Sequence, residues 1–172
     1  MSTLVVNAMH NTSGAYSITG VGKILQVVSV TKSDVYTNSS NPDTWTDITG
    51  MSVAITPSSA SNKVLVYAIS RVSCNNHAAC AIKRGSTLIA VGDADGSRRP
   101  TSTGEQYDLG NQYRSMDSPI MYLDSPSTTS ATTYKMCFWA SEEFFFNRTR
   151  YDHNSSAVAR PTSGITLMEI GA

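Results

Sequence analysis

Apolar residues in this chain recur at strand spacing, in short runs separated by turn residues. The longest run, residues 63–73, carries apolar or small residues at both odd and even positions, which is typical of a strand covered on both faces. The last run, residues 164–172, has the same character. We therefore expect a second strand covered on both faces there, and a C-terminus that lies inside the fold or near its centre.

Other runs of β-branched or alternating residues predict further strands. Residues 45–48 and 51–55 form two short runs divided by Gly50, and the runs at 78–84 and 86–91 flank Gly85 as a hairpin would. The remaining expected strands are residues 23–31, 116–123, 132–140 and 165–170, with another beginning at 144–146.

No segment shows sustained helical periodicity, and turn signals recur about every ten residues. The sequence therefore predicts an all-β fold, an antiparallel β-sandwich or jelly roll, with a closed barrel as the alternative. Residues 1–21 are rich in Gly, Ser and Thr, and strand periodicity begins only at Lys23. We expect an extended N-terminal arm over 1–21 and one β-sandwich module over 22–172.

The composition argues against nucleic acid and anionic membranes as partners. The 172 residues are enough for one compact domain, and the charged fraction is only 15% with a formal net charge of zero. No basic surface for nucleic acid or an anionic membrane is therefore indicated. The sequence also shows no export signal and no apolar run long enough to span a membrane. Three cysteines are a sparse, odd set, which favours free thiols.

Two segments resemble fragments of metal sites. Cys74, His77 and Cys80 are ligand types that zinc prefers, but a second pair at usable spacing is missing, so we expect a loop whose cysteines pack as small apolar groups. The polar stretch 92–111 contains Asp93-Ala-Asp95-Gly96, part of a calcium loop without its other acidic ligands. A tight polar turn is favoured there, in a stretch that is functional or clamped by a neighbour.

Residues for catalysis are not assembled by any recognisable motif. The nucleophile elbow Gly-x-Ser-x-Gly is absent, and the adjacent Glu142 and Glu143 would face opposite sides of a strand. We expect no catalytic residues, no cofactor and no metal, and a protein that is not an enzyme. Arg148, Arg150 and Arg160 interleave with Asp152, which favours surface charge pairs or contacts between subunits.

Aromatic residues are concentrated between residues 134 and 151. The three consecutive phenylalanines at 144–146 cannot all point to one face of a strand, so one of them should be buried elsewhere. We interpret this segment as a subunit interface, with a loop wrapped over the sandwich as the alternative.

Six blocks in fixed order carry a resemblance that covers the chain from about residue 22 to its end. They are residues 22–29, 45–59, 62–66, 82–87 with 92–98, 122–126 with 131–134, and 164–170. Together they resemble a module of tailed bacteriophages, including marine bacteriophages and cyanophages, that usually forms the C-terminal tip of tail-fibre or other virion structural proteins. The resemblance implies a jelly-roll-like, homotrimeric virion component assembled in the cytoplasm of the host bacterium.

The expected function is a short tail fibre or fibre tip in host attachment, with a capsid decoration or cement protein as the alternative. Expected partners are other virion proteins, reached through the arm 1–21, and a host surface glycan or protein. The long shaft that usually precedes such a module is missing from this sequence, so the arm is expected to dock a short fibre or to clamp the module to a capsid lattice. A polysaccharide-cleaving enzyme is a weaker alternative, because it needs placed carboxylates.

Overall fold

The computed structural model describes residues 22–39, 44–104, 106–107 and 113–172. The expected arm, residues 1–21, lies outside the described residues. The described part of the chain forms eleven strands and no helix. It therefore contains no helix long and apolar enough to cross a membrane. The predicted all-β class is confirmed.

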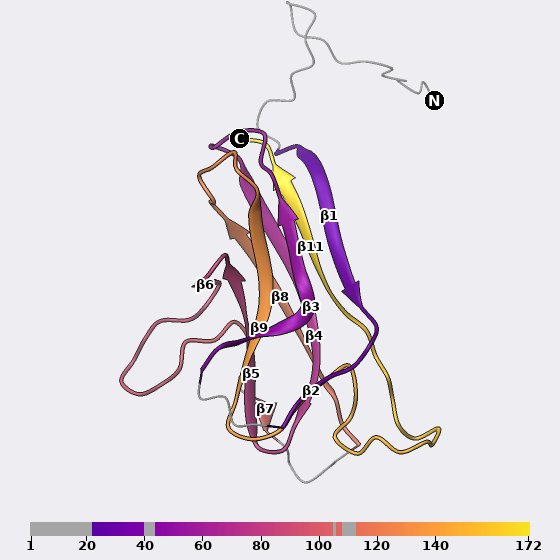
Figure 1. Ribbon diagram of the computed structural model, residues 1–172. Helices are drawn as coiled ribbons and strands as arrows, with labels where there is room; N and C mark the ends of the chain where they lie inside the picture. The colour runs from indigo at the N-terminus through magenta and orange to yellow at the C-terminus, as the bar shows by residue number, and fades with distance from the viewer. Residues whose placement is uncertain (1–21, 40–43, 105, 108–112) are drawn as a thin grey trace, which may run out of the picture.

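The strands form two antiparallel sheets packed face to face (Figure 1). The larger sheet contains β1 (Ile24–Lys32), β11 (Ser163–Ile170), β4 (Lys63–Cys74), β8 (Met116–Asp124), β10 (Phe144–Phe146) and β2 (Tyr36–Asn38). The smaller sheet contains β3 (Thr46–Ile55), β9 (Thr132–Ala140), β5 (His77–Arg84), β6 (Thr87–Ile89) and β7 (Gln106–Tyr107).

The long strands pair in a nested order. β1 pairs with β11, β3 with β9, β4 with β8, and β5 with β6, so the chain folds back on itself as one long antiparallel hairpin rolled into two layers. This is the strand arrangement of a jelly roll. The β-sandwich prediction is confirmed in its jelly-roll form.

The segments expected as two strands at 45–48 and 51–55 are one strand, β3. Gly50 does not end the strand, because its φ of +84° lets the backbone continue through a bulge. The pairing of β3 with β9 shifts register between Asp47 and Ser52 around this point. The sequence pattern predicts a break at Gly50, whereas the structure has a bulge there.

The hairpin at Gly85 is confirmed: β5 and β6 are joined by a tight turn in which Gly85 has φ +60°. The strands β2 and β7 were not predicted. They have three and two residues, and each is held by its neighbour, β2 by β10 and β7 by β5. Segments this short carry no periodic pattern of their own.

The two strands expected to be covered on both faces are covered on only one. In β4 the even-numbered positions are buried, whereas Leu65, Tyr67 and Ile69 are exposed or half-buried. In β11 Ile165 and Leu167 are buried, and the residues between them are half-buried. The prediction is wrong within a single chain because the smaller sheet covers only the inner face.

The start of β1 and the end of β11 lie at the same end of the sandwich. The Gly171 N–H donates to the carbonyl of Lys23 at 2.8 Å, and β11 lies between β1 and β4. β11 is thus a central strand. Ala172, however, is exposed at the end of the sandwich, so the prediction of a C-terminus inside the fold or near its centre is wrong (Figure 1). The loop 147–162, which leads into the first residue of β11, lies at the opposite end.

The aromatic residues expected at a subunit interface are buried within the chain. Phe138, Phe144 and Phe146 belong to the core between the sheets. Phe145 points to the other side of β10, yet it is only 5% exposed because the guanidinium of Arg148 covers its ring at 4.8 Å. The interface interpretation is wrong for these side chains, which need no second subunit to leave water.

A buried carboxylate fixes the C-terminal strand to its neighbours. Glu169 accepts hydrogen bonds from the side chains of Asn62 (2.5 Å) and Gln26 (2.6 Å) and from the backbone N–H and hydroxyl of Ser58, both at 2.7 Å. Burial alone would raise the pKa of Glu169, but these donors outweigh it and lower the pKa to about 2. The carboxylate therefore remains charged at neutral pH.

A second carboxylate links the two sheets. Asp124 of β8 accepts two hydrogen bonds from the Arg84 guanidinium, at 2.8 and 2.9 Å, and one from the hydroxyl of Tyr134 at 2.6 Å. Burial and the adjacent carboxylate raise the pKa of the Tyr134 hydroxyl, which stays a donor. The packing of β8 against β5 and β9 of the other sheet is thereby fixed.

Candidate functional site

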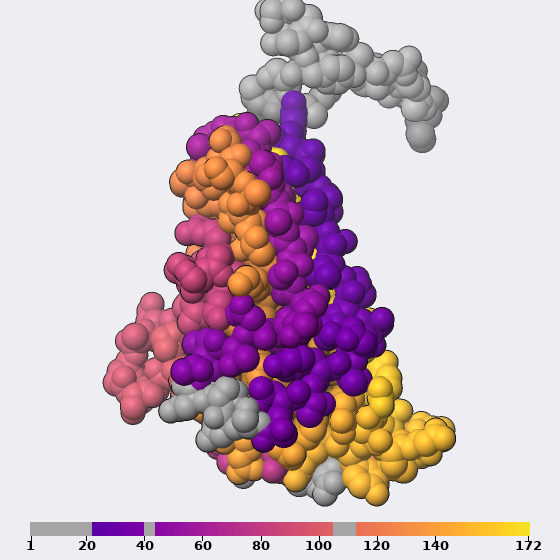
Figure 2. Space-filling model, in the orientation of Figure 1, coloured from indigo at the N-terminus to yellow at the C-terminus, as the bar shows by residue number. Residues whose placement is uncertain are grey.

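The loop 147–162 protrudes from the end of the sandwich opposite Lys23 and Ala172 (Figures 1 and 2). Its first residue, Asn147, is fully buried with φ +59°. The Asn147 side chain donates to the carbonyls of Lys32 (2.8 Å) and Asp34 (3.0 Å) and accepts from the Ser163 hydroxyl (2.6 Å). One amide thus fixes both roots of the loop to the end of β1.

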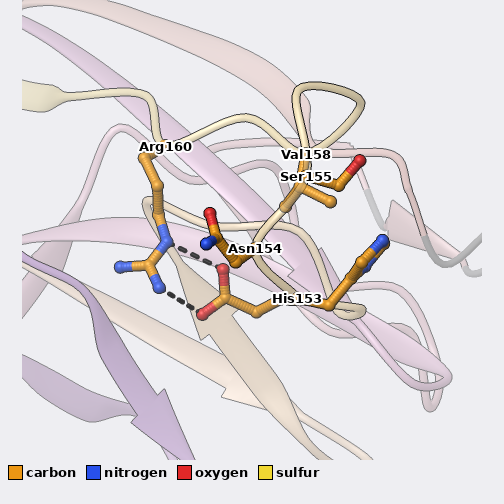
Figure 3. Close-up of a pocket in the computed structure, with 6 residues that line it drawn as sticks. His153, Asn154, Ser155, Val158 and Arg160 are labelled. Carbon is orange, nitrogen blue, oxygen red and sulfur yellow. Dashed lines mark hydrogen bonds and ion pairs between the residues drawn. The ribbon is translucent and has the colours of Figure 1, made fainter.

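Inside the loop two arginines flank one carboxylate. Asp152, 14% exposed, lies 3.5 Å from Nε of Arg148, and it accepts from Nε of Arg160 at 2.8 Å and from a terminal nitrogen of the same guanidinium. The hydrogen bonds of Arg160 are dashed in Figure 3. This confirms the surface charge pairs expected for Arg148 and Arg160. Two guanidiniums on one carboxylate leave the group net positive.

A hollow of about 340 Å³ lies in the curve of this loop (Figure 3). Arg160 and His153 lie on opposite sides of Asn154 in that view. The lining residues are Asp152, His153, Asn154, Ser155, Val158 and Arg160. The volume is at the small end of the range of ligand pockets, and the wall offers guanidinium, amide, imidazole and hydroxyl groups for hydrogen bonding.

Three rings form an exposed aromatic cluster beside the hollow. Tyr151 and His153 lie with their ring centroids 4.5 Å apart, and Tyr113 meets Tyr151 edge-on at 5.5 Å. Tyr113 is 52% exposed and Tyr151 is 45% exposed. Exposed tyrosine and arginine are residue types favoured where a surface binds a partner. We call Tyr113, Tyr151, Asp152, His153, Asn154 and Arg160 the distal site.

A second hollow, of about 420 Å³, lies on the smaller sheet where the loop 92–104 folds over it. There the Arg99 guanidinium stacks on Trp139 at 3.8 Å from the ring centroid. The Thr103 hydroxyl accepts from the backbone N–H of Cys80 at 3.0 Å, which ties the loop to β5. Arg99 and Thr103 therefore hold this loop to its own sheet, whereas residues 93–98 are exposed.

The zinc-like cluster is not assembled. Cys74 and Cys80 are buried, and the Cys74 thiol donates to the carbonyl of Asn76 at 2.9 Å. Burial raises the pKa of the Cys80 thiol to about 12, which disfavours the thiolate that zinc requires. Within the described residues no three His, Cys, Asp or Glu side chains lie close enough together to hold a metal ion.

The acidic candidates have structural partners. Asp95 pairs with Arg98 across the tight turn of the calcium-like fragment, as a polar turn predicts. Glu142 accepts from the side-chain amide of Asn75 at 2.6 Å, and the carbonyl of Glu143 accepts from the Asn75 N–H at 3.0 Å. These contacts hold the turn between β4 and β5 against the one between β9 and β10.

The distal site could not be assembled from the sequence. Tyr113 and Tyr151 are far apart in the chain, and only the fold brings their rings together. The available signal was the run Arg150-Tyr-Asp-His153, in which charged and aromatic residues alternate in a segment without strand periodicity. That signal indicates an exposed loop but not what lies beside it.

In comparisons with known proteins, neither a protein-family model nor a curated protein matches the chain.

Proposed function

We propose that this chain is a non-enzymatic structural protein of a tailed bacteriophage, a short tail fibre or fibre tip that contacts the host surface. The resemblance of six ordered blocks, residues 22–170, supports this proposal. The jelly-roll sandwich is compatible with it. The fibre is proposed to be a homotrimer.

The observation that carries the proposal is the separation of the two ends of the sandwich. Lys23 and Gly171 are hydrogen-bonded at one end, and the distal site lies at the other (Figure 1). An attachment arm formed by residues 1–21 joins the module at the Lys23 end. A module docked in this way presents the distal site away from the particle.

The chemistry of the distal site suits a polar surface ligand. Tyr113 and Tyr151 offer ring area with hydroxyl groups, and Asn154 and Arg160 offer hydrogen-bond donors at the hollow beside them. Rings combined with donors of this kind bind sugars and polar peptide surfaces alike. A host glycan or surface protein is therefore the proposed partner of this end.

Cell binding tests the attachment role. Labelled purified protein should bind host cells and compete with the phage for adsorption, and Arg160→Ala should weaken binding about tenfold, the equivalent of about 1.4 kcal/mol. Arg98→Ala is the matched control, because Arg98 also pairs with an aspartate on an exposed loop but lies outside the distal site. Equal losses in both variants, or no binding by the wild type, would contradict the attachment role.

Deletion of residues 1–21 tests the arm. The remaining protein should fold and oligomerise but should no longer enter particles. A truncated protein that still enters particles, or one that is unfolded, would contradict the proposal that the arm serves attachment. The place of the full-length chain, in the head shell or in the tail, separates the capsid decoration role from the fibre role.

A further inference from the structure

The outer face of the larger sheet is apolar and open. Three rows of paired residues cross four strands on this face, in the order β1, β11, β4 and β8. The rows are Val27–Met168–Leu65–Leu123, Ser29–Thr166–Tyr67–Met121 and Thr31–Gly164–Ile69–Pro119. We call these twelve residues the outer face.

The outer face contains four of the ten large apolar side chains that are exposed among the described residues: Val27, Tyr67, Met121 and Leu123. Met121 is 74% exposed, Val27 54% and Leu123 52%. Among the described residues, every exposed large apolar side chain other than Tyr113 and Tyr151 belongs to β1, β4 or β8. Contiguous apolar patches beyond a few hundred Å² are rare on proteins that work as monomers and mark interaction surfaces.

The size of the face suits a subunit contact. With strands about 4.8 Å apart and rows about 6.8 Å apart, the twelve positions span about 400 Å² of flat projected surface. The relief of the side chains enlarges this area, and Ile24 and Leu25 extend it at one end. The flat area alone is about half of the about 800 Å² that each partner contributes to a stable interface.

The charges around the face suit another copy of the same chain. Arg71 and Asp117 border one end of the face and pair with each other at 3.1 Å, whereas Lys63 borders the other end and donates to the Ser125 hydroxyl at 2.7 Å. The twelve residues themselves carry no charge. The chain has a formal net charge of zero, so two copies do not repel one another. Flat sheet faces pack closely on other sheet faces at about 10 Å.

We propose that the outer face is the surface through which copies of this chain associate, so that the larger sheets of neighbouring chains pack together around a common axis. The proposal explains why the outward positions of β4 and β11 are apolar although the smaller sheet covers only their inner face. It deepens the proposed function by naming the surface that forms the fibre, and it rests on that function only for the number of copies, three.

Light scattering of the purified full-length protein tests the inference. The wild type should have a mass that is a multiple of 18.5 kDa at micromolar concentration, three times that value for the trimer. Met121→Glu, which places a charge at the most exposed position of the face, should lower the mass to that of one chain. Tyr113→Glu is the control, since Tyr113 is 52% exposed but lies outside the face, and it should leave the mass unchanged.

A monomeric wild type, or a Met121→Glu protein that keeps the oligomeric mass, would overturn the inference. Neither result bears on the proposed function, which cell binding and particle location test separately.

Methionine oxidation tests the same surface without a substitution. In a single chain Met121 is 74% exposed and Met116, on the same strand, 37%. Covering by a second copy should make Met121 react with peroxide more slowly than Met116 in the wild type. Faster oxidation of Met121, measured by mass spectrometry of the native protein, would contradict a covered face.

Discussion

Phe138 of β9 and Phe144 of β10 stack with their ring centroids 4.1 Å apart and their planes inclined by only 13°. The two strands belong to different sheets, so this contact crosses the core of the sandwich. Phe146 continues the stack from the same short strand, at 6.2 Å from Phe144. Two residues of β10, Phe144 and Phe146, thereby join the sheets near the end that carries the distal site.

Replacing Phe144 with alanine should therefore destabilise the fold severely. Loss of a fully buried phenylalanine leaves a cavity between the sheets and costs about 3–5 kcal/mol of unfolding free energy. Urea denaturation followed by circular dichroism measures the change. Tyr151→Ala, at an exposed ring, should change the unfolding free energy by less than about 0.5 kcal/mol. Similar losses in the two variants would argue against the cross-sheet stack.

Glu169 should make stability depend on acid pH. Its pKa is lowered in the folded chain to about 2, below its value of 4.5 when unpaired, so the stabilisation is complete above about pH 5 and is lost as the pH falls toward 2. Glu169→Gln should remove this part of the pH dependence and destabilise the protein at pH 7. Thermal melts of both proteins between pH 2 and 7 check this. Parallel pH profiles would contradict it.

The three cysteines should be unreactive in the folded protein. All three are buried free thiols, and burial raises the pKa of Cys80 and of Cys137 to about 12. A thiol reagent should find almost no reactive group in native protein at pH 8 and three after denaturation without reductant. A disulfide, or rapid labelling of the native protein, would contradict the prediction of three buried free thiols.

The C-terminal strand should be essential. β11 lies between β1 and β4, and Leu167 is fully buried, so Leu167→Ala should cost about 2–5 kcal/mol. A chain cut after Gly164 should not fold at all, because it loses the partner of both neighbouring strands. Calorimetry on the substituted and the truncated proteins measures both effects. A cooperative melt of the truncated chain would show that the strand is peripheral.

The strand positions could be predicted because each long strand carries its own pattern. Lys63–Cys74 and Thr132–Ala140 lie within a residue of the predicted ranges. The assignment of strands to the two sheets could not be predicted from these local patterns. Phe144 and Phe138, for example, meet only when β10 is placed beside β4. A run of three phenylalanines has the same sequence whether it faces a core or a partner.

The two-faced strands show a different limit. The apolar residues at Leu65 and Met168 were predicted to be covered, and in the single chain they are only half-buried. The apolar pattern indicates that these positions are covered, but it does not indicate whether the same chain or another chain covers them. The distal site was missed for a third reason: Tyr113 reaches Tyr151 through the fold, and polar loop residues carry no period from which to predict a contact.

A density map of the intact particle tests the central claim most directly. The account predicts this chain in the tail, in three copies around an axis, with the outer face toward that axis and the loop 147–162 toward the outside. A particle that lacks this chain altogether would contradict the claim that it is a virion protein.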